Sequence, residues 1–450
     1  MGGNGHVIPS TPIAIDMWNT KQHPQARIFF LSHFHGDHIV GLTSSWQYPI
    51  YASPLTCKLL IHKIKIKPSL VKSLEIGEDH LIPLDIDNQE MVTITLFDAN
   101  HCPGSVMFLF SGYFGDILYT GDFRYKPEIF GAFQLPPIDV LYLDNTYCSP
   151  KCFFPTREDV IEKILSQVHD CLVKNDRIFL GLDNLGKEDL LLAIAKERNC
   201  KIWVNPNRKE VMSIIGFPDI FTSDKSETKI FVVPTNQISI RNMVEWNKEM
   251  KTHAILATAR FCGFNFKPFS AQSDIHVIPY SNHSSYLELK KFIKEVKPAS
   301  VIPIVGKHVK GIFGTDISDR ADMKVFQEFL RESTASECVI PASVKRTMSL
   351  CELNNNACRP LKKRKIARKM TWRRPLSVGI RYIVSEDSGT DSDPDAIHIE
   401  GEKTLISCNE GVSEFSSSEI SENYDSEESD SDWEVTLVTG KGSQKVPLVK

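Results

Sequence analysis

The sequence predicts an α/β protein that ends in a disordered tail. Three observations carry this prediction. Up to about residue 150 the chain holds short apolar segments of strand length, and from Thr156 onward such segments alternate with stretches whose apolar residues recur at helical spacing. Beyond about residue 335 the chain carries opposed blocks of charge, which cannot bury enough apolar surface to fold.

Length and composition narrow the class of protein. A chain of 450 residues exceeds the usual domain size of about 100–200 residues, so we expect two folded units, or one large unit with a tail. No window approaches the roughly 20 apolar residues of a membrane span, and the first residues lack the basic and apolar regions of a signal peptide. The 11 cysteines are scattered and form no C-x-x-C pair. We therefore expect a protein of a reducing compartment, neither secreted nor bound to a membrane.

The β-rich first part is predicted from segments rich in Val, Ile, Phe and Tyr. These predicted strands cover residues 6–16, 27–31, 92–98, 106–110, 117–120 and 140–143. The pattern then changes at Thr156. This threonine is followed by Arg157 and by the acids Glu158 and Asp159, an order that is typical of a helix N-terminus.

The second part alternates strands and helices, as in a parallel sheet. Its predicted strands cover residues 177–182, 201–204, 229–233, 254–257, 274–279 and 301–305. The first predicted helix begins at Thr156. Further predicted helices cover residues 187–198, 209–215, 240–247 and 285–296.

The tail, expected over residues 336–450, holds two charged blocks. Ten Lys or Arg and no acid lie from Arg359 to Arg381, whereas 17 Asp or Glu face one base from Glu386 to Glu434. The run from Lys362 to Lys369 predicts a nuclear localisation signal or a nucleic-acid patch, with a plain solvated charge run as the alternative.

The most informative motif follows the predicted strand at 27–31. It reads Ser32-His33-Phe34-His35-Gly36-Asp37-His38 and places four metal-binding side chains within six residues. Neutral imidazoles suit zinc, and the carboxylate allows a second metal to be held beside the first. Because the whole chain has only 14 histidines, three within six residues are improbable by chance. The motif therefore predicts a metal site.

Further ligands are available at the ends of other predicted strands. His101 follows the strand at 92–98, Asp122 follows the strand at 117–120, and Asp16 closes the first strand. Each of these alone is more often a turn or cap residue. Together with the histidine-rich motif they complete one site.

The order H-x-H-x-D-H, a distant His and a distant Asp resembles the metallo-β-lactamase signature. Leu143–Tyr147 (LDNTY) and Tyr280–Tyr286 (YSNHSSY) resemble motifs A and B of the β-CASP branch, above all of its DNA-directed nucleases. The resemblance covers about residues 5 to 310. It implies an αββα sandwich built from residues 1–150 and 276–335, with an α/β β-CASP domain inserted at 151–275.

The resemblance also implies roles for individual residues. One metal ion would be held by His33, His35 and His101, with Asp122 bridging to a second site at Asp37 and His38. The ions would be one or two Zn²⁺, or zinc with another divalent metal. The expected catalytic residues are Asp37, His38, Asp16, which would orient a ligand, Asp144 of motif A, and His283, which would contact the scissile phosphate. The alternative for His283 is a cap of the helix at 285–296.

A pocket for a terminal 5′-phosphate is implied near motifs A and B. Its candidate residues are Asn145, Thr146 and Ser284. Lys187 is a further candidate because the turn Leu185–Glu188 opens a helix and can present amides and a lysine to phosphate, although a plain β–α turn explains the segment equally well.

The activity that follows is a zinc-dependent 5′→3′ DNA exonuclease of nuclear DNA repair, including interstrand crosslink repair. Its partners would be DNA with a 5′-phosphate and DNA repair proteins. The alternatives are an RNA endonuclease of the cleavage-factor type, a small-molecule metallo-hydrolase and a non-catalytic repair scaffold. RNA-processing relatives carry a histidine where this chain has Val305, which favours DNA.

The chain departs from the family pattern at three places. Asn282 stands where Asp is usual, Phe231 replaces a histidine that we expect to touch phosphate, and the tail lacks the Tyr-x-Leu-x-Pro peptide that docks on a telomeric repeat-binding protein. End preference and a role in telomere-end processing therefore remain open at this point.

Overall fold

The computed structural model describes residues 5–264, 268–311, 314–332 and 338–357, and short strands at 379–380, 401–402, 434–439 and 442–447. The chain divides into two compact units. The described residues up to 357 belong to the first. The second holds two antiparallel pairs, β18 (Gly379–Ile380) with β19 (Gly401–Glu402) and β20 (Glu434–Thr439) with β21 (Gly442–Pro447). The basic run and most of the acidic run lie outside the described residues.

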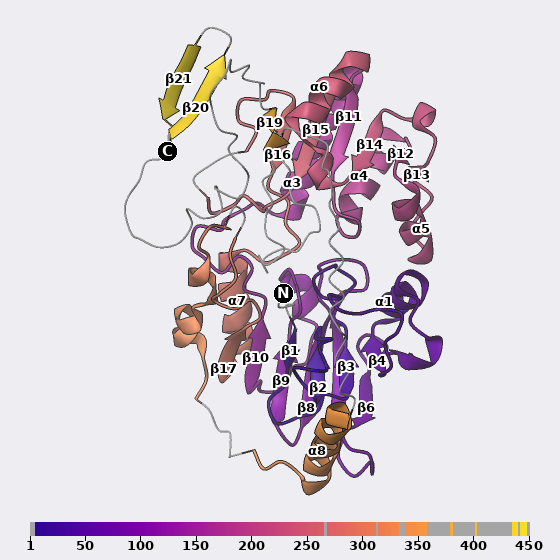
Figure 1. The fold of residues 1–450 in the computed structure, drawn as a ribbon, viewed down its shortest axis with the longest axis vertical. Coiled ribbons are helices and arrows are strands. Elements are labelled where there is room, and N and C mark those ends of the chain that lie inside the picture. Colours follow the sequence, from indigo (N-terminus) through magenta and orange to yellow (C-terminus); the bar gives the residue numbers. More distant parts are fainter. Residues whose placement is uncertain are drawn as a thin grey trace, which may run out of the picture. The chain divides into compact units, whose positions relative to one another are not determined.

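The first unit begins with two sheets (Figure 1). The first has the order β1-β2-β3-β4-β5. Its strands are β1 (His6–Val7), β2 (Ile13–Ile15), β3 (Ile28–Phe30), β4 (Ile50–Ala52) and β5 (Val71–Ser73). The second has the order β17-β10-β9-β8-β7-β6. Its strands are β6 (Asp79–Pro83), β7 (Met91–Asp98), β8 (Val106–Gly112), β9 (Gly115–Tyr119), β10 (Val140–Leu143) and β17 (Ser300–Pro303).

These two sheets pack face to face. Because successive side chains of a strand point to opposite faces, each sheet can direct one set of apolar residues at the other sheet. In β3, Phe30 joins a core with Phe108 and Phe110 of β8, whereas Phe29 points to the opposite face. That opposite face is covered by α1 (Pro54–Leu59) and η1 (Leu60–Ile64). The outer face of the second sheet is covered by α7 (Tyr286–Val296), through Leu289, Phe292 and Ile293. The predicted αββα sandwich is confirmed.

A third, parallel sheet is formed by residues between β10 and α7. Its order is β13-β12-β14-β11-β15-β16. The strands are β11 (Arg177–Gly181), β12 (Ile202–Trp203), β13 (Phe221–Thr222), β14 (Ile230–Val233), β15 (Thr252–Ala257) and β16 (Ile275–Ile278). The helices among them are α3 (Arg157–Val173), α4 (Glu188–Arg198), α5 (Pro206–Ile214) and α6 (Ile240–Glu249). Short helical turns elsewhere are α2 (Pro127–Phe130), η2 (Pro68–Leu70), η3 (Lys225–Glu227), η4 (Thr235–Gln237), η6 (Ser318–Ala321) and η7 (Met323–Phe329).

The first unit extends further than the expected boundary at residue 335. Helix α8 (Ala342–Ala357) lies within the range predicted as tail, and its Val344 is fully buried in the core between the first two sheets. Ile340, just before the helix, and Met348 pack against the same core. The sequence pattern did not reveal α8 because few apolar residues hold it and the charged blocks begin only two residues after its end. No helix of the described residues has the length and apolar character needed to cross a bilayer.

Candidate metal centre

The predicted metal ligands meet where several strands end. His33, His35, Asp37 and His38 follow β3, His101 follows β7, and Asp122 follows β9. Gly121 allows Asp122 to come this close, because a Cβ at this positive-φ position would lie 2.8 Å from the Cβ of Ser32. The structure therefore brings all six predicted ligands together from three separate parts of the sequence.

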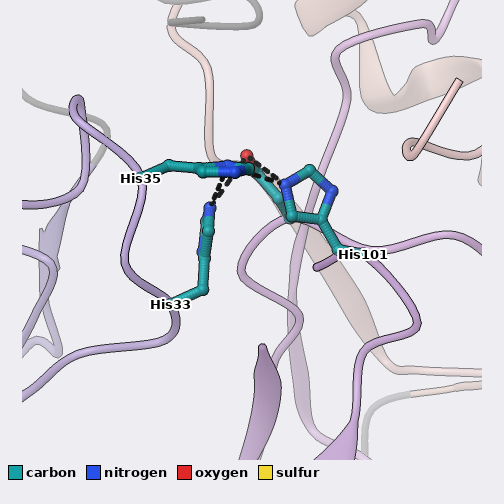
Figure 2. A group of neighbouring side chains, drawn as sticks. His33, His35 and His101 are labelled. Atoms are coloured by element: carbon teal, nitrogen blue, oxygen red, sulfur yellow. Dashed lines mark hydrogen bonds and ion pairs between the residues drawn. The ribbon is translucent and has the colours of Figure 1, made fainter. Parts of the chain in front are cut away.

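The first group of ligands surrounds a single point. His35 Nδ1 lies 3.0 Å from both His33 Nε2 and His101 Nε2, and Figure 2 shows the three rings converging. Asp122 Oδ2 lies 3.6 Å from His33 Nε2 and 3.7 Å from His101 Nε2. Ligands about 2.0–2.1 Å from a tetrahedral zinc ion are about 3.3–3.4 Å apart, so these separations suit such an ion.

The second group shares Asp122 with the first. His38 Nε2 lies 3.1 Å from Asp37 Oδ2 and 3.3 Å from Asp122 Oδ2. The His33 and His38 side chains are fully buried, whereas those of Asp37 and Asp122 are 10% and 11% exposed. Asp37, Asp122 and the partly exposed His35 thus form the accessible side of the cluster.

Each imidazole has an oxygen acceptor on its outer nitrogen. The His33 Nδ1–H donates to Ser32 Oγ (3.0 Å), the His35 Nε2–H to the Leu185 carbonyl (3.1 Å) and the His101 Nδ1–H to the Asn282 carbonyl (3.1 Å). This leaves the lone pairs of the inner nitrogens directed at one another, an arrangement that a cation between them stabilises. The donor set therefore fits a divalent metal ion.

The pKa shifts agree with this reading. Burial, with neighbouring imidazoles, lowers the pKa of His33 and His101 well below the ordinary value, which keeps both rings neutral. Burial would also lower the pKa of His38, but the carboxylates of Asp37, Asp122 and Asp16 raise it well above the usual range. The same negative field attracts a metal cation.

Asp16 holds His38 from outside the cluster, as expected. Its Oδ2 accepts hydrogen bonds from His38 Nδ1 (2.8 Å) and Ser32 Oγ (2.7 Å), and its Oδ1 accepts from the Ser32 amide (2.8 Å). Asp16 follows β2 in the left-handed region, with φ at 54°, a conformation that Asp adopts more readily than most residues.

Replacement of Asp16 by Asn is expected to weaken metal binding about 10- to 100-fold, because the amide cannot orient both His38 and Ser32. Metal content after dialysis against a graded chelator measures this directly. Asp79→Asn, on β6, is the matched control and is expected to keep the parental affinity. Unchanged metal affinity in Asp16→Asn would contradict the positioning role.

His283 and Asp144 form a second buried pair beside the cluster. His283 Nδ1 lies 2.9 Å from Asp144 Oδ2, and the His283 ring centroid lies 4.7 Å from that of His101. The cap of α7 is Ser285, which forms a capping box with Glu288, so His283 is not the cap. His283 instead lines the small pocket above the metal ligands.

Three candidates for the phosphate pocket are committed to other contacts. The Asn145 side chain bonds the amide and carbonyl of Val305 and the carbonyl of Arg320. The Ser284 hydroxyl donates to the Phe123 carbonyl and accepts from the Tyr125 amide. Thr146 is buried and donates its amide to Asp144. None of these three side chains lines the small pocket beside the metal ligands.

Lys187 and the two departures from the family pattern, Asn282 and Phe231, lie in different surroundings. Lys187 lines the pocket, where its Nζ donates to Asp183 Oδ2 at 2.5 Å. Asn282 accepts a hydrogen bond from His101 through its backbone carbonyl. A chain with Asp at this position could form the same bond, because the side chain takes no part in it. Phe231 stacks on Phe179 and lines a different cavity from the small pocket at the metal ligands.

The sequence did not reveal the groups that brace these loops. The Leu185 and Asn282 carbonyls that orient metal ligands belong to the backbone and leave no signature in residue type. Arg157 of α3 bonds Asn100 and the Ser281 carbonyl, and so ties the loop of His101 to motif B. Asp183 lies two residues after the end of β11, and the rule that site residues follow strand ends would have indicated it.

Comparisons with known proteins agree with the geometry. Residues 217–308 match the family described as DNA repair metallo-beta-lactamase. The chain is 39% identical to the 5′ exonuclease Apollo of Mus musculus over 85% of this chain and 66% of that protein, and 43% identical to Apollo of Danio rerio over 77% and 57%. It is 33% identical to the DNA cross-link repair protein SNM1 of Arabidopsis thaliana over 72% and 69%.

The chain thus spans 57% to 66% of the length of these Apollo proteins. The match to SNM1 extends over most of both chains, and the family match runs from the third sheet through motif B to α7 and β17. The chain therefore belongs to the DNA repair metallo-β-lactamase family, as its histidine-rich motif and its αββα sandwich indicated.

Proposed function

We propose that this protein is a metal-dependent nuclease of DNA repair that removes nucleotides from the 5′ end of DNA. The observation that carries the proposal is the set of inward-facing imidazole nitrogens joined by Asp122 to a second group, in a chain similar to proteins named 5′ exonuclease Apollo. The position of Val305 supports DNA over RNA, since relatives that process RNA carry a histidine there.

The metal-holding residues follow from the two groups. His33, His35, His101 and Asp122 would hold one ion, and Asp37, His38 and Asp122 the other, with zinc as the expected metal. Such ions lower the pKa of water and neutralise the negative charge of a phosphodiester. Asp144 fixes the His283 ring at the pocket, where His283 would contact the scissile phosphate or donate a proton to the departing oxygen.

The pocket above the ligands has a volume of about 20 Å³, enough for a water molecule. One wall is made by His35, His101 and Asp122, and another by Asp183, Leu185 and Lys187. A nucleotide is much larger, so the loop Asp183–Lys187 would move when DNA binds. Lys187 would then exchange its bond to Asp183 for one to the terminal 5′-phosphate.

Digestion of end-labelled DNA tests the proposal most directly. The purified full-length chain, loaded with zinc, should shorten single- and double-stranded DNA from the 5′ end, should leave RNA of the same sequence largely intact, and should lose this activity in chelator. Recovery on addition of zinc controls for unfolding. Cleavage of RNA in preference to DNA would support an RNA endonuclease instead, and full metal occupancy without any cleavage would support a scaffold.

The charged tail is proposed to direct the protein to the nucleus. Deletion of residues 358–450 retains α8 and every metal ligand, so the activity should stay within a few-fold of the full chain while nuclear accumulation falls. Neutralising the run from Lys362 to Lys365 should reproduce the defect, whereas neutralising Glu427, Glu428 and Asp430 should not. Imaging of tagged protein measures both. A truncated protein that is wholly nuclear, or catalytically dead, would contradict this role.

A further inference from the structure

The third sheet has one face that the described helices cover only in part. Ile178 and Leu180 of β11, with Ile230 and Val232 of β14, point into a core shared with α3, α4 and α5. The alternate residues point to the other face, where α6 packs beside β15. A groove of about 990 Å³ lies there over β11, β14 and β12. Parallel sheets usually have both faces covered, so this face is unusual among the described residues.

Aromatic rings form the floor and sides of this groove. Phe179 and Phe231 stack at a centroid distance of 5.2 Å, and Trp203 lies 5.7 Å from Phe231. On the other side Trp246 of α6 stacks on Phe179 at 4.0 Å and 11°. Phe179 and Phe231 are buried, whereas both tryptophans are half-buried and present ring surface to the groove. Such flat apolar surfaces are suited to stacking with planar groups.

The charges around the groove favour an anion. Four cationic residues line it, Arg177, Arg198, Lys225 and Lys229, against two acids, Glu227 and Glu249. Arg177 pairs with Glu249 at 3.0 Å, whereas the exposed Lys225 places its Nζ 5.4 Å above the Trp203 ring. Positive charge beside aromatic rings is the combination that binds single-stranded nucleic acid, the rings taking the bases and the cations the phosphates.

The groove also begins next to the metal pocket. One end is lined by Val233 and Gln237, and Thr235 between them donates to Asp183 Oδ1, which belongs to the pocket wall. From Val233 the groove follows β14 back to Lys229. Four strand steps of about 3.3 Å give about 13 Å, which accommodates three or four bases stacked about 3.4 Å apart.

We propose that this groove binds a short single-stranded segment of the DNA substrate, beyond the nucleotide that occupies the metal pocket. The bases stack against Trp203 and Trp246, and the phosphates contact Lys225 and its cationic neighbours. The inference rests on the proposed nuclease function for its substrate, but strand binding can be measured without cleavage.

The test compares variants of the full chain in two assays. Fluorescence anisotropy of a labelled oligothymidine in chelator gives binding, and hydrolysis of a 5′-phosphorylated dinucleotide, too short to reach the groove, gives chemistry. Trp203→Ala should weaken strand binding about tenfold to a hundredfold. Lys225→Glu should weaken it and lower the dependence of binding on salt by about one counterion. Dinucleotide hydrolysis should be unchanged in both.

Lys248→Glu is the matched control, because Lys248 lies on the exposed side of α6 and does not line the groove. It should bind oligothymidine as the parent does. Equal affinity for oligothymidine in Lys225→Glu and Lys248→Glu would overturn the proposal. So would a loss of heparin binding in Trp203→Ala as large as its loss of oligothymidine binding, because heparin has charge but no bases. If Trp203→Ala fails to fold, Lys225→Glu decides. Groove-dependent strand binding in a protein that cleaves no DNA would sustain the groove and refute the nuclease.

Discussion

Hydrolysis of DNA is expected to fall to background, by at least about 100-fold, when Asp37 is replaced by Asn or His38 by Ala. His38 Nε2 lies 3.1 Å from Asp37 Oδ2 and 3.3 Å from Asp122 Oδ2, so both side chains point into the cluster and not into an apolar core. Their loss removes ligands from the second group while His33, His35 and His101 remain. The protein should therefore fold normally and retain at least part of its metal.

Three measurements separate this outcome from unfolding: the rate on end-labelled DNA, metal content, and the thermal unfolding midpoint. Asp219→Asn and His308→Ala are matched controls, since both residues are exposed and lie outside the cluster. The controls should keep the parental rate. A variant of Asp37 or His38 with normal zinc and normal turnover would show that the second group has no part in the chemistry.

The second large effect concerns the end of the DNA. A 5′-phosphate should be removed with its nucleotide tenfold to more than a hundredfold faster than a 5′-hydroxyl end. Each charge-assisted hydrogen bond lost with the phosphate costs about 1.5–3 kcal/mol, and about 1.4 kcal/mol corresponds to one decade in rate. Phe231 should not reduce this preference, because its side chain lies in the groove and not in the metal pocket.

Lys187→Met should abolish most of this preference while changing the rate on 5′-hydroxyl DNA little. Lys196→Met, in the last turn of the same helix, provides the control and should retain the full preference. Product analysis should yield mononucleotides released from the 5′ end. Equal rates on both ends in the parent protein, or products released from the 3′ end, would show that the terminal phosphate is not recognised.

The cluster of side chains that could hold a metal ion was predictable from the sequence because the chemistry restricts the residue type. Only a few side chains bind zinc, and His33, His35 and His38 stand so close together that chance is a poor explanation. Strand ends then indicated His101 and Asp122. Elements with weaker patterns were missed, among them α1, which begins after the Ser53 cap with Pro54 at its first position.

Residues that act through hydrogen bonding to the backbone were harder to assign. Asn145 and Ser284 belong to motifs that also contain the candidate catalytic residues Asp144 and His283, so the sequence places them near the centre but cannot give the direction of their side chains. In the structure, Asn145 faces Val305 and Ser284 faces Phe123. Similarly, the segment 6–16 reads as one strand, but a turn with Ser10 at φ 64° divides it into β1 and β2.

The carbonyl of Leu185, in the loop that follows β11, connects the third sheet to a candidate metal ligand. His35 is held by this carbonyl, and the same loop closes the pocket that DNA must reach. If the proposed shift of this loop carries Leu185 away, His35 loses its acceptor. Loop closure and metal binding would then be linked by reciprocity: the factor by which the closed loop tightens the metal is the factor by which the metal stabilises the closed loop. On this proposal, metal loading would oppose the admission of DNA.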